Sequence, residues 1–183
     1  MSYLVPDTEI AGTGTWTSFG SGANNVARLN TAPTSDTSNG ILTSTSTTLG
    51  TIAYGLTNPS ISVDTAADVK IGIIAAAEDP IGLGAFSCDL ILKEGGISGT
   101  TIATLSFSRD IDYPGVFGGS EATLSAGEKA AVSDWADLCL VIGTPDAGLA
   151  TGQFSVSELW LEYTEGSGGG SSRRRNLPLM GVG

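Results

Sequence analysis

Hydrophobic and polar residues alternate with a period of two through the middle of the chain. The clearest segments are FSCDLILKEGG (86–96) and TIATLSFSRD (101–110). In each, the apolar positions share one parity: Phe86, Cys88, Leu90 and Leu92, then Ala103, Leu105 and Phe107. This pattern is typical of half-buried strands. The short turn GGISG (95–99) between the two segments therefore predicts an antiparallel hairpin.

Further segments rich in β-branched and aromatic residues predict additional strands. They are TGTWTSFG (13–20), a short segment around Val26–Leu29, one or two strands within 41–56, DVKIGIIAAA (68–77), LCLVIGT (138–144) and QFSVSELWLEYTE (153–165). TAPTSDTSNG (31–40) has the composition of a loop. The total is about eight strands, each separated from the next by turn residues.

The alternation slips in the last predicted strand. Phe154 and Val156 share one parity, whereas Leu159, Leu161 and Tyr163 share the other. A β-bulge near Ser157–Glu158 would place all five side chains on one face. Alternatively, Trp160 packs inward and the leucine face meets a partner.

One short helix is predicted near 125–135. Ser125 followed by Glu128 has the spacing of a capping box, and the segment is rich in alanine. Strands and helices do not alternate, so a parallel sheet is not expected. The predicted fold is an all-β, antiparallel, two-sheet β-sandwich of jelly-roll-like type.

The composition changes sharply after Glu165. GSGGGSS (166–172) has the composition of a flexible linker, and RRRNLPLMGVG (173–183) is basic at its start and apolar at its end. The predicted organisation is a sandwich domain at 1–165, a linker at 166–172 and a C-terminal tail at 173–183. The 183-residue chain is long enough for the sandwich to bury a core of its own.

The tail is interpreted as a docking peptide, although a disordered terminus with solubilising arginines has the same composition. The arginines would pair with acidic groups of a neighbouring subunit, and the apolar residues would fill a groove. The predicted docking residues are Arg173, Arg174, Arg175, Leu177, Pro178, Leu179 and Met180.

Charge separates the tail from the body of the chain. The net charge is −11, and residues 1–165 hold all 19 acidic residues but only five of the eight basic ones. Such a body repels nucleic acid and anionic membranes, and three arginines alone bind nucleic acid weakly. Neither a signal peptide nor a membrane-spanning segment is expected. Cys88 and Cys139 are too far apart for a zinc motif and are expected to be buried thiols.

The residues needed for common catalytic sites are missing. The sequence has no histidine, no GxSxG motif and no P-loop. Its carboxylate pairs, such as Asp110 and Asp112, are neighbours in turns, whereas a glycosidase needs carboxylates across a cleft. Acidic loops at 64–68 and 108–115 could offer oxygen ligands to calcium, but they lack EF-hand spacing. The chain is predicted to have no enzymatic activity, cofactor or bound metal.

The aromatic residues suggest one contact surface. Trp16, Trp135 and Trp160 lie in or beside predicted elements, so they are interpreted as core residues rather than a sugar-binding platform. Tyr113 and Phe117 lie in the Gly-rich segment DYPGVFGG (112–119) and are the better candidates for a surface contact. If the domain binds a host glycan or a receptor, the loops around 78–84 and 111–119 are the expected site.

Four segments resemble structural proteins of tailed bacteriophages. They are LVPDTEI followed by GTWT (14–17), LSAGEKAAVSDWADLCLVIG (124–143), VSELWLEY (156–163) and the tail RRRNLPLMGVG. One departure stands out: an Arg-rich strand would be expected after the Trp motif, whereas LCLVIG is uncharged and should be more buried.

The resemblance implies a virion protein with a jelly-roll-like fold, assembled in the host cytoplasm and built into a symmetric oligomer such as a trimer. It implies an accessory structural role among other virion proteins, either as capsid decoration or as a tail or fibre-attachment subunit. A carbohydrate- or receptor-binding module of a tail fibre is the alternative. The sequence does not decide between a head and a tail location.

Overall fold

A computed structural model describes residues 1–12, 16–19, 40–43, 51–57, 62–79, 84–143 and 153–166. The strand predicted around Val26–Leu29 and most of the loop predicted at 31–40 lie outside these residues. The elements are β1 (Ser2–Leu4), β2 (Pro6–Gly12), β3 (Trp16–Phe19), β4 (Gly40–Thr43), β5 (Ile52–Leu56), β6 (Lys70–Glu78), β7 (Ala85–Glu94), β8 (Thr100–Asp112), β9 (Gly118–Thr123), α2 (Ala126–Ala131), β10 (Leu138–Ile142) and β11 (Gln153–Tyr163).

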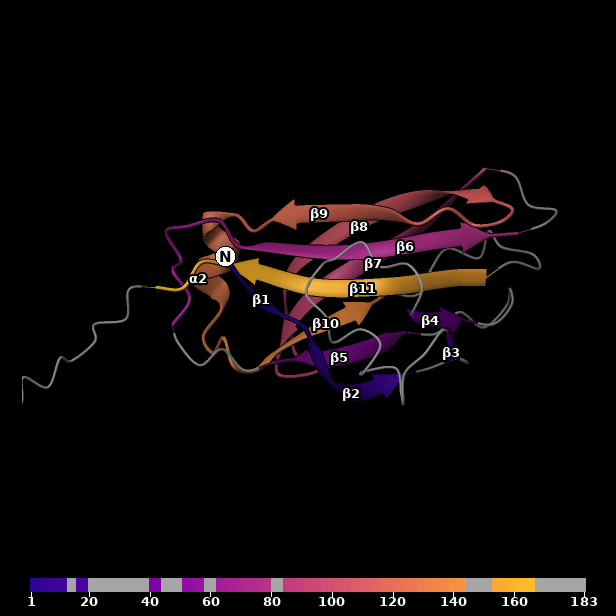
Figure 1. Ribbon diagram of the computed structural model, residues 1–183. Coiled ribbons are helices and arrows are strands. Elements are labelled where there is room, and N and C mark those ends of the chain that lie inside the picture. The colour runs from indigo at the N-terminus through magenta and orange to yellow at the C-terminus, as the bar shows by residue number, and fades with distance from the viewer. Residues whose placement is uncertain are drawn as a thin grey trace, which may run out of the picture.

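The strands form two facing sheets (Figure 1). Sheet A has the order β3-β4-β11-β6-β9, with β1 also paired to β11, and sheet B has the order β2-β5-β10-β7-β8. All pairings are antiparallel except a short parallel contact between the ends of β6 and β8. The eight strands from β4 to β11 thus form two four-stranded sheets, β4-β11-β6-β9 and β5-β10-β7-β8, which is the order of a jelly roll. The predicted fold class is confirmed.

Local sequence signals account for the best-predicted elements. β7 and β8 pair from Ala85↔Asp110 to Glu94↔Thr100, which confirms the predicted hairpin. In β11 the register against β6 shifts between Val156 and Glu158, where the bulge was predicted. The bulge brings Phe154, Val156, Leu159, Leu161 and Tyr163 into the same core, so the leucines do not form a separate partner-facing surface.

The short helix is present with both halves of its capping box. The Glu128 amide donates to Ser125 Oγ at 3.3 Å, and the Ser125 amide donates to Glu128 Oε2 at 2.6 Å. Helix α2 is nevertheless only six residues long and buries none of its side chains. The segment after it holds Trp135, which packs against the core while staying partly exposed.

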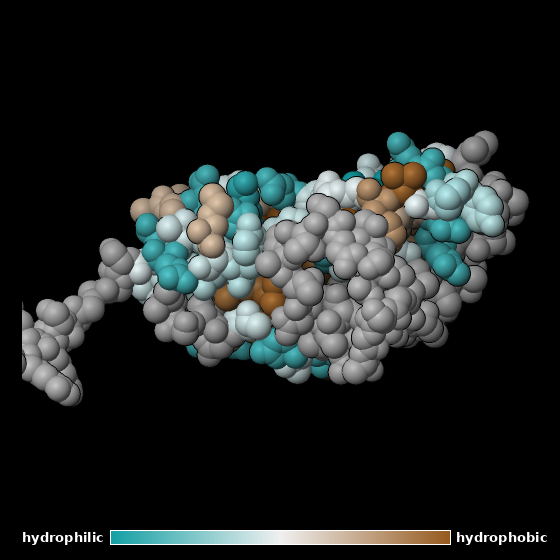
Figure 2. All heavy atoms as spheres, in the orientation of Figure 1, coloured by the Kyte–Doolittle hydropathy of each residue, from teal (hydrophilic) through white to brown (hydrophobic). Residues whose placement is uncertain are grey.

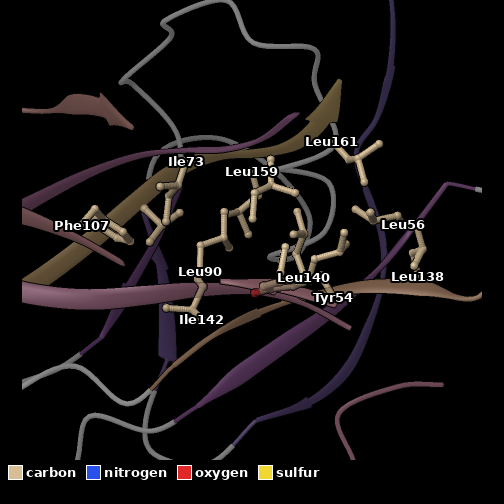
Figure 3. Close-up of a cluster of buried hydrophobic side chains, with 14 of the residues drawn as sticks. Tyr54, Leu56, Ile73, Leu90, Phe107, Leu138, Leu140, Ile142, Leu159 and Leu161 are labelled. Atoms are coloured by element: carbon tan, nitrogen blue, oxygen red, sulfur yellow. The ribbon is translucent and has the colours of Figure 1, made fainter. Parts of the chain in front are cut away.

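The core lies between the two sheets (Figure 3). Ile73, Leu159 and Leu161 from sheet A face a larger set from sheet B: Tyr54, Leu56, Leu90, Phe107, Leu138, Leu140 and Ile142. The rings of Phe86 and Phe154 join the sheets, with their centroids 4.8 Å apart. β10 is wholly buried because it is a central strand of sheet B, as the uncharged LCLVIG segment predicted.

The sequence reading missed three strands, β1, β2 and β9. β1 and β2 carry the chain from sheet A to sheet B, since β1 pairs with β11 and β2 with β5. β9 includes the last two residues of the segment interpreted as a long loop (112–119), and β8 extends into its first residue. No helix among the described residues is long and apolar enough to span a membrane.

Candidate functional site

The two loops named by the sequence reading meet at one end of the sandwich. The end of β6 lies beside the end of β8, with Glu78 paired to Asp112. The Gly115 amide donates to Glu78 Oε2 at 3.1 Å, and the Ile111 amide donates to the Gly84 carbonyl at 3.0 Å. Segments 78–79 and 84 therefore form one surface with segment 111–117, whereas residues 80–83 lie outside the described chain.

Two apolar side chains project from this end of the molecule. Tyr113 is 70% exposed and Val116 is 63% exposed. Phe117, the second residue predicted for the contact surface, is partly buried, whereas its neighbour Val116 is exposed. We call the segment Asp112–Phe117 the tip loop. In Figure 2, hydrophobic atoms reach the surface at this end among hydrophilic ones.

Val116 was missed because a single valine in a glycine-rich loop has no distinctive sequence pattern. The structure explains why the neighbouring residue 115 is a glycine. A Cβ at this position would lie 3.0 Å from Glu78 Cβ, tighter than ordinary contacts. The glycine lets the tip loop approach β6 closely enough for its amide to reach the Glu78 carboxylate.

Arg109 fixes the base of the tip loop. Its Nε donates to the Ala75 carbonyl at 3.2 Å and to the Gly118 carbonyl at 2.9 Å, and its Nη2 donates to Ser120 Oγ at 2.9 Å. The guanidinium also lies 5.4 Å from the centroid of the Phe107 ring. Burial lowers the pKa of Arg109. One side chain thus links β8 to β6 and β9. These hydrogen bonds hold in place the two strand ends that flank the tip loop.

Carboxylates surround the tip loop. Asp110 and Asp112 are exposed, and Glu78 is partly buried. Among the described residues, no group of three or more acidic or cysteine side chains lies close enough together to hold a metal ion. The arrangement offers hydrogen-bond acceptors around an exposed aromatic ring. It is suited to contact with a partner surface or a polyhydroxylated ligand.

The predicted tail lies elsewhere in the chain and outside the described residues, so the seven docking residues from Arg173 to Met180 stay a prediction. The chain leaves the sandwich at the end opposite the tip loop (Figure 1). There the Gly166 amide donates to the Ser62 carbonyl at 2.7 Å, and Ser2 Oγ donates to Glu165 Oε1 at 2.8 Å. The first residue of the predicted linker is thus held against the sandwich.

The other aromatic and thiol candidates whose side chains the structure describes are structural. Trp160 is 6% exposed and packs over Gly72 on the outer face of sheet A, and the side chain of Trp16 lies outside the description. Cys88 and Cys139 are buried, as predicted, and burial raises the pKa of the Cys88 thiol to about 12. Trp160, Cys88 and Cys139 do not contribute to the tip surface.

Comparisons with known proteins add only distant likenesses. No family model matches the chain, and no curated protein matches it in sequence. A solved structure titled "CBM4 structure and function" aligns with a TM-score of 0.41 and 12% identity, over 81% of this chain and 94% of that one. The enzymatically active domain of tailspike protein 4 from bacteriophage CBA120 aligns with a TM-score of 0.38 and 12% identity. That match covers 81% of this chain but only 19% of the tailspike chain. At these TM-scores, neither likeness carries an argument about function.

Proposed function

We propose that this chain is a non-enzymatic accessory structural protein of a phage particle, which connects two neighbouring virion surfaces. The observation that carries the proposal is the exposed pair Tyr113 and Val116, held on a fixed loop at the end opposite the exit of the chain from β11. Tyrosine is one of the residue types enriched among the side chains that contribute most to protein interfaces.

The sandwich would serve as a rigid spacer between these two points. β6 runs from Lys70, which pairs with Glu162 near the exit of the chain, to Glu78, which holds the tip loop. Its nine residues span about 30 Å at about 3.3 Å per residue. A tail bound to one neighbour and a tip loop bound to another would act as two linked weak sites, and linkage raises the overall affinity without new contacts.

The second candidate function is a glycan- or receptor-binding module. It rests on the exposed Tyr113 ring, which could stack on the apolar face of a sugar while the nearby carboxylates accept hydrogen bonds from hydroxyl groups. A sugar platform commonly uses several aromatic rings, whereas Tyr113 is the one exposed aromatic residue among those whose side chains the structure describes. We therefore place the structural role first.

Co-sedimentation with phage particles that lack the protein tests the proposal. The full chain, a version ending at Gly166, and the double variant Tyr113→Ala/Val116→Ser would be compared. The replaced residues are exposed, so the fold should be unchanged. Ile10→Ser is the matched control, because Ile10 is a 43% exposed apolar residue on β2, away from the tip loop.

The full chain and the Ile10→Ser control should co-sediment, and both the tip variant and the shortened chain should bind several-fold more weakly. Binding of the tip variant at the level of the full chain would remove the tip loop from the proposal. If the full chain does not bind particles but is retained on a glycan array in a Tyr113-dependent way, the sugar-binding function replaces the structural one.

A further inference from the structure

β8 is the last strand on one side of sheet B, and part of its outer edge has no partner among the described strands. Residues Ala103–Ser108 pair with β7 on one side, and among the described strands no partner lies on the other side of this stretch. The backbone of β8 pairs with β6 at its far end, at Ile111 and Asp112. Unpaired backbone groups on such an edge can form hydrogen bonds with another strand.

Other edges of the sandwich carry features that discourage added strands. β2, the opposite edge of sheet B, begins at Pro6, carries Asp7 and Glu9, and shifts register twice against β5. β9, an edge of sheet A, is six residues long and contains two glycines and Glu121. Proline, charge, irregularity and short length are the usual protections of an edge strand.

Ala103–Ser108 has none of these protections. The sequence ATLSFS contains no charged residue, proline or glycine, and its register against β7 is unbroken from Ala103 to Ser108. Arg109 bounds the stretch, since its Nη1 donates to the Ser108 carbonyl at 2.7 Å. At the other end, near the start of β8, helix α2 lies close to the strand (Figure 1).

The two faces of this stretch differ in chemistry. Thr104, Ser106 and Ser108 point outward and are exposed, whereas Phe107 points into the core and is buried. Leu105 also packs against the core but stays partly exposed. A strand added at this edge would extend sheet B and would cover the exposed part of the Leu105 side chain.

We propose that the β8 edge pairs antiparallel with the β8 edge of a second copy of this chain, about a twofold axis that is perpendicular to the sheet and passes beside Leu105 or beside Ser106. Residues opposite one another in a sheet share a face, so self-pairing sets hydroxyl side chains opposite hydroxyl side chains and apolar ones opposite apolar ones. The stretch is therefore complementary to itself, as a twofold interface requires. The two copies of sheet B become one continuous sheet.

The negative charge of the chain does not oppose this pairing locally. Two acidic residues lie near the stretch on its outer face. Asp110 follows Ser108 by two residues on β8, and antiparallel pairing centred on Leu105 or Ser106 sets it and its copy at opposite ends of the interface. Asp89 is on β7, and its Oδ1 accepts a hydrogen bond from Ser106 Oγ at 2.6 Å. In the pair, Asp89 and its copy would be three strand spacings apart, about 14 Å. This exceeds the Debye length of about 8 Å at physiological ionic strength, so their repulsion is largely screened.

Sedimentation velocity of the full chain over a wide range of concentrations tests the proposal. The variant Thr104→Lys/Ser106→Lys sets lysines opposite one another in any in-register antiparallel pairing of this stretch, which is unfavourable. The control Ala85→Lys/Ser87→Lys adds the same two charges at exposed positions of β7, one strand in from the edge. Circular dichroism checks that each variant is folded.

The full chain and the β7 control should show a concentration-dependent dimer, and the β8 variant should dimerise at least about tenfold more weakly. A full chain that is monomeric at every concentration overturns the proposal. So does a dimer that the β8 lysines leave unchanged, because it must use another surface. If both lysine variants lose dimerisation equally, the loss is caused by net charge rather than by the β8 edge, and the proposal is also overturned. The result is independent of particle binding.

Discussion

Trp160 packs over the backbone of Gly72, and this contact depends on the absence of a side chain at residue 72. A Cβ there would lie 2.1 Å from Trp160 Cζ2, a distance that requires the indole ring or one of the two strands to move. The tryptophan is on the outer face of sheet A, because its neighbours Leu159 and Leu161 point into the core. The pair therefore stabilises the contact between β6 and β11 from outside.

The variant Gly72→Ala should lower the free energy of unfolding by about 1–3 kcal/mol, the usual cost of overpacking a well-packed site. Gly119→Ala is the matched control on the adjacent strand, since the nearest atom to its added Cβ would be 4.0 Å away. The midpoint of urea denaturation should fall for Gly72→Ala and change little for Gly119→Ala. Equal midpoints for the two variants would contradict this description of the contact.

Residue-level sequence reading identified some of these features and missed others. Tyr113 and Phe117 could be placed on a contact loop because the segment DYPGVFGG is rich in glycine, but the sequence does not distinguish Val116 from Phe117 in exposure. Nor could it detect the partnership of Gly72 with Trp160 or the role of Arg109. Both depend on strands that are far apart in sequence and become neighbours only in the fold.

At the scale of elements, hydrophobic periodicity worked where a strand has one face on the core. β7, β8 and the bulged β11 were predicted for this reason. β2 and β9 were missed because PDTEIAG and GGSEAT show little apolar alternation. These edge strands form because β5 and β6 offer them partners, a tertiary effect that local propensity does not contain.

Two carboxylates near helix α2 should make stability depend on acid pH. Hydrogen bonds from the Ser133 side chain and backbone lower the pKa of Glu94, and those from Ser125 lower the pKa of Glu128. A carboxylate whose pKa is lower in the folded state stabilises fully above its ordinary pKa of 4.5. This stabilisation is lost as the pH falls through the lower pKa of the folded state.

The variant Glu94→Gln/Glu128→Gln should therefore be less stable than the natural chain at neutral pH, and its stability should fall less between pH values above and below 4.5. Urea denaturation at a series of pH values measures both effects. Asp68→Asn/Asp137→Asn removes two exposed carboxylates and is the charge-matched control. If the Glu variant and the natural chain lose stability in parallel on acidification, these hydrogen bonds do not carry the pH dependence.

At the scale of the whole molecule, the sequence predicted the architecture but not the strand order. The number of short strands and the lack of helix alternation favoured a sandwich. The jelly-roll order arises because successive strands mostly cross between sheets, for example from β4 to β5 and from β5 to β6. Such crossings depend on which strands become neighbours in each sheet. The hydrophobic pattern predicts which face of a strand is buried but not which strands lie beside it.

This architecture sets the tip loop and the exit of the chain at opposite ends of one rigid body. In the proposed function, both ends contact other virion proteins at the same time. A sandwich alone does not require this, since many jelly rolls bind through a single surface. The orientation of the bound protein therefore distinguishes the two arrangements.

Cryo-electron microscopy of particles reconstituted with the full chain would show this orientation. We expect density for the sandwich with Tyr113 and Val116 against one neighbouring protein, and with the Gly166 end directed at another. A sandwich bound to the particle with its tip loop facing solvent, and with contacts through the sheet faces alone, would contradict the proposed function.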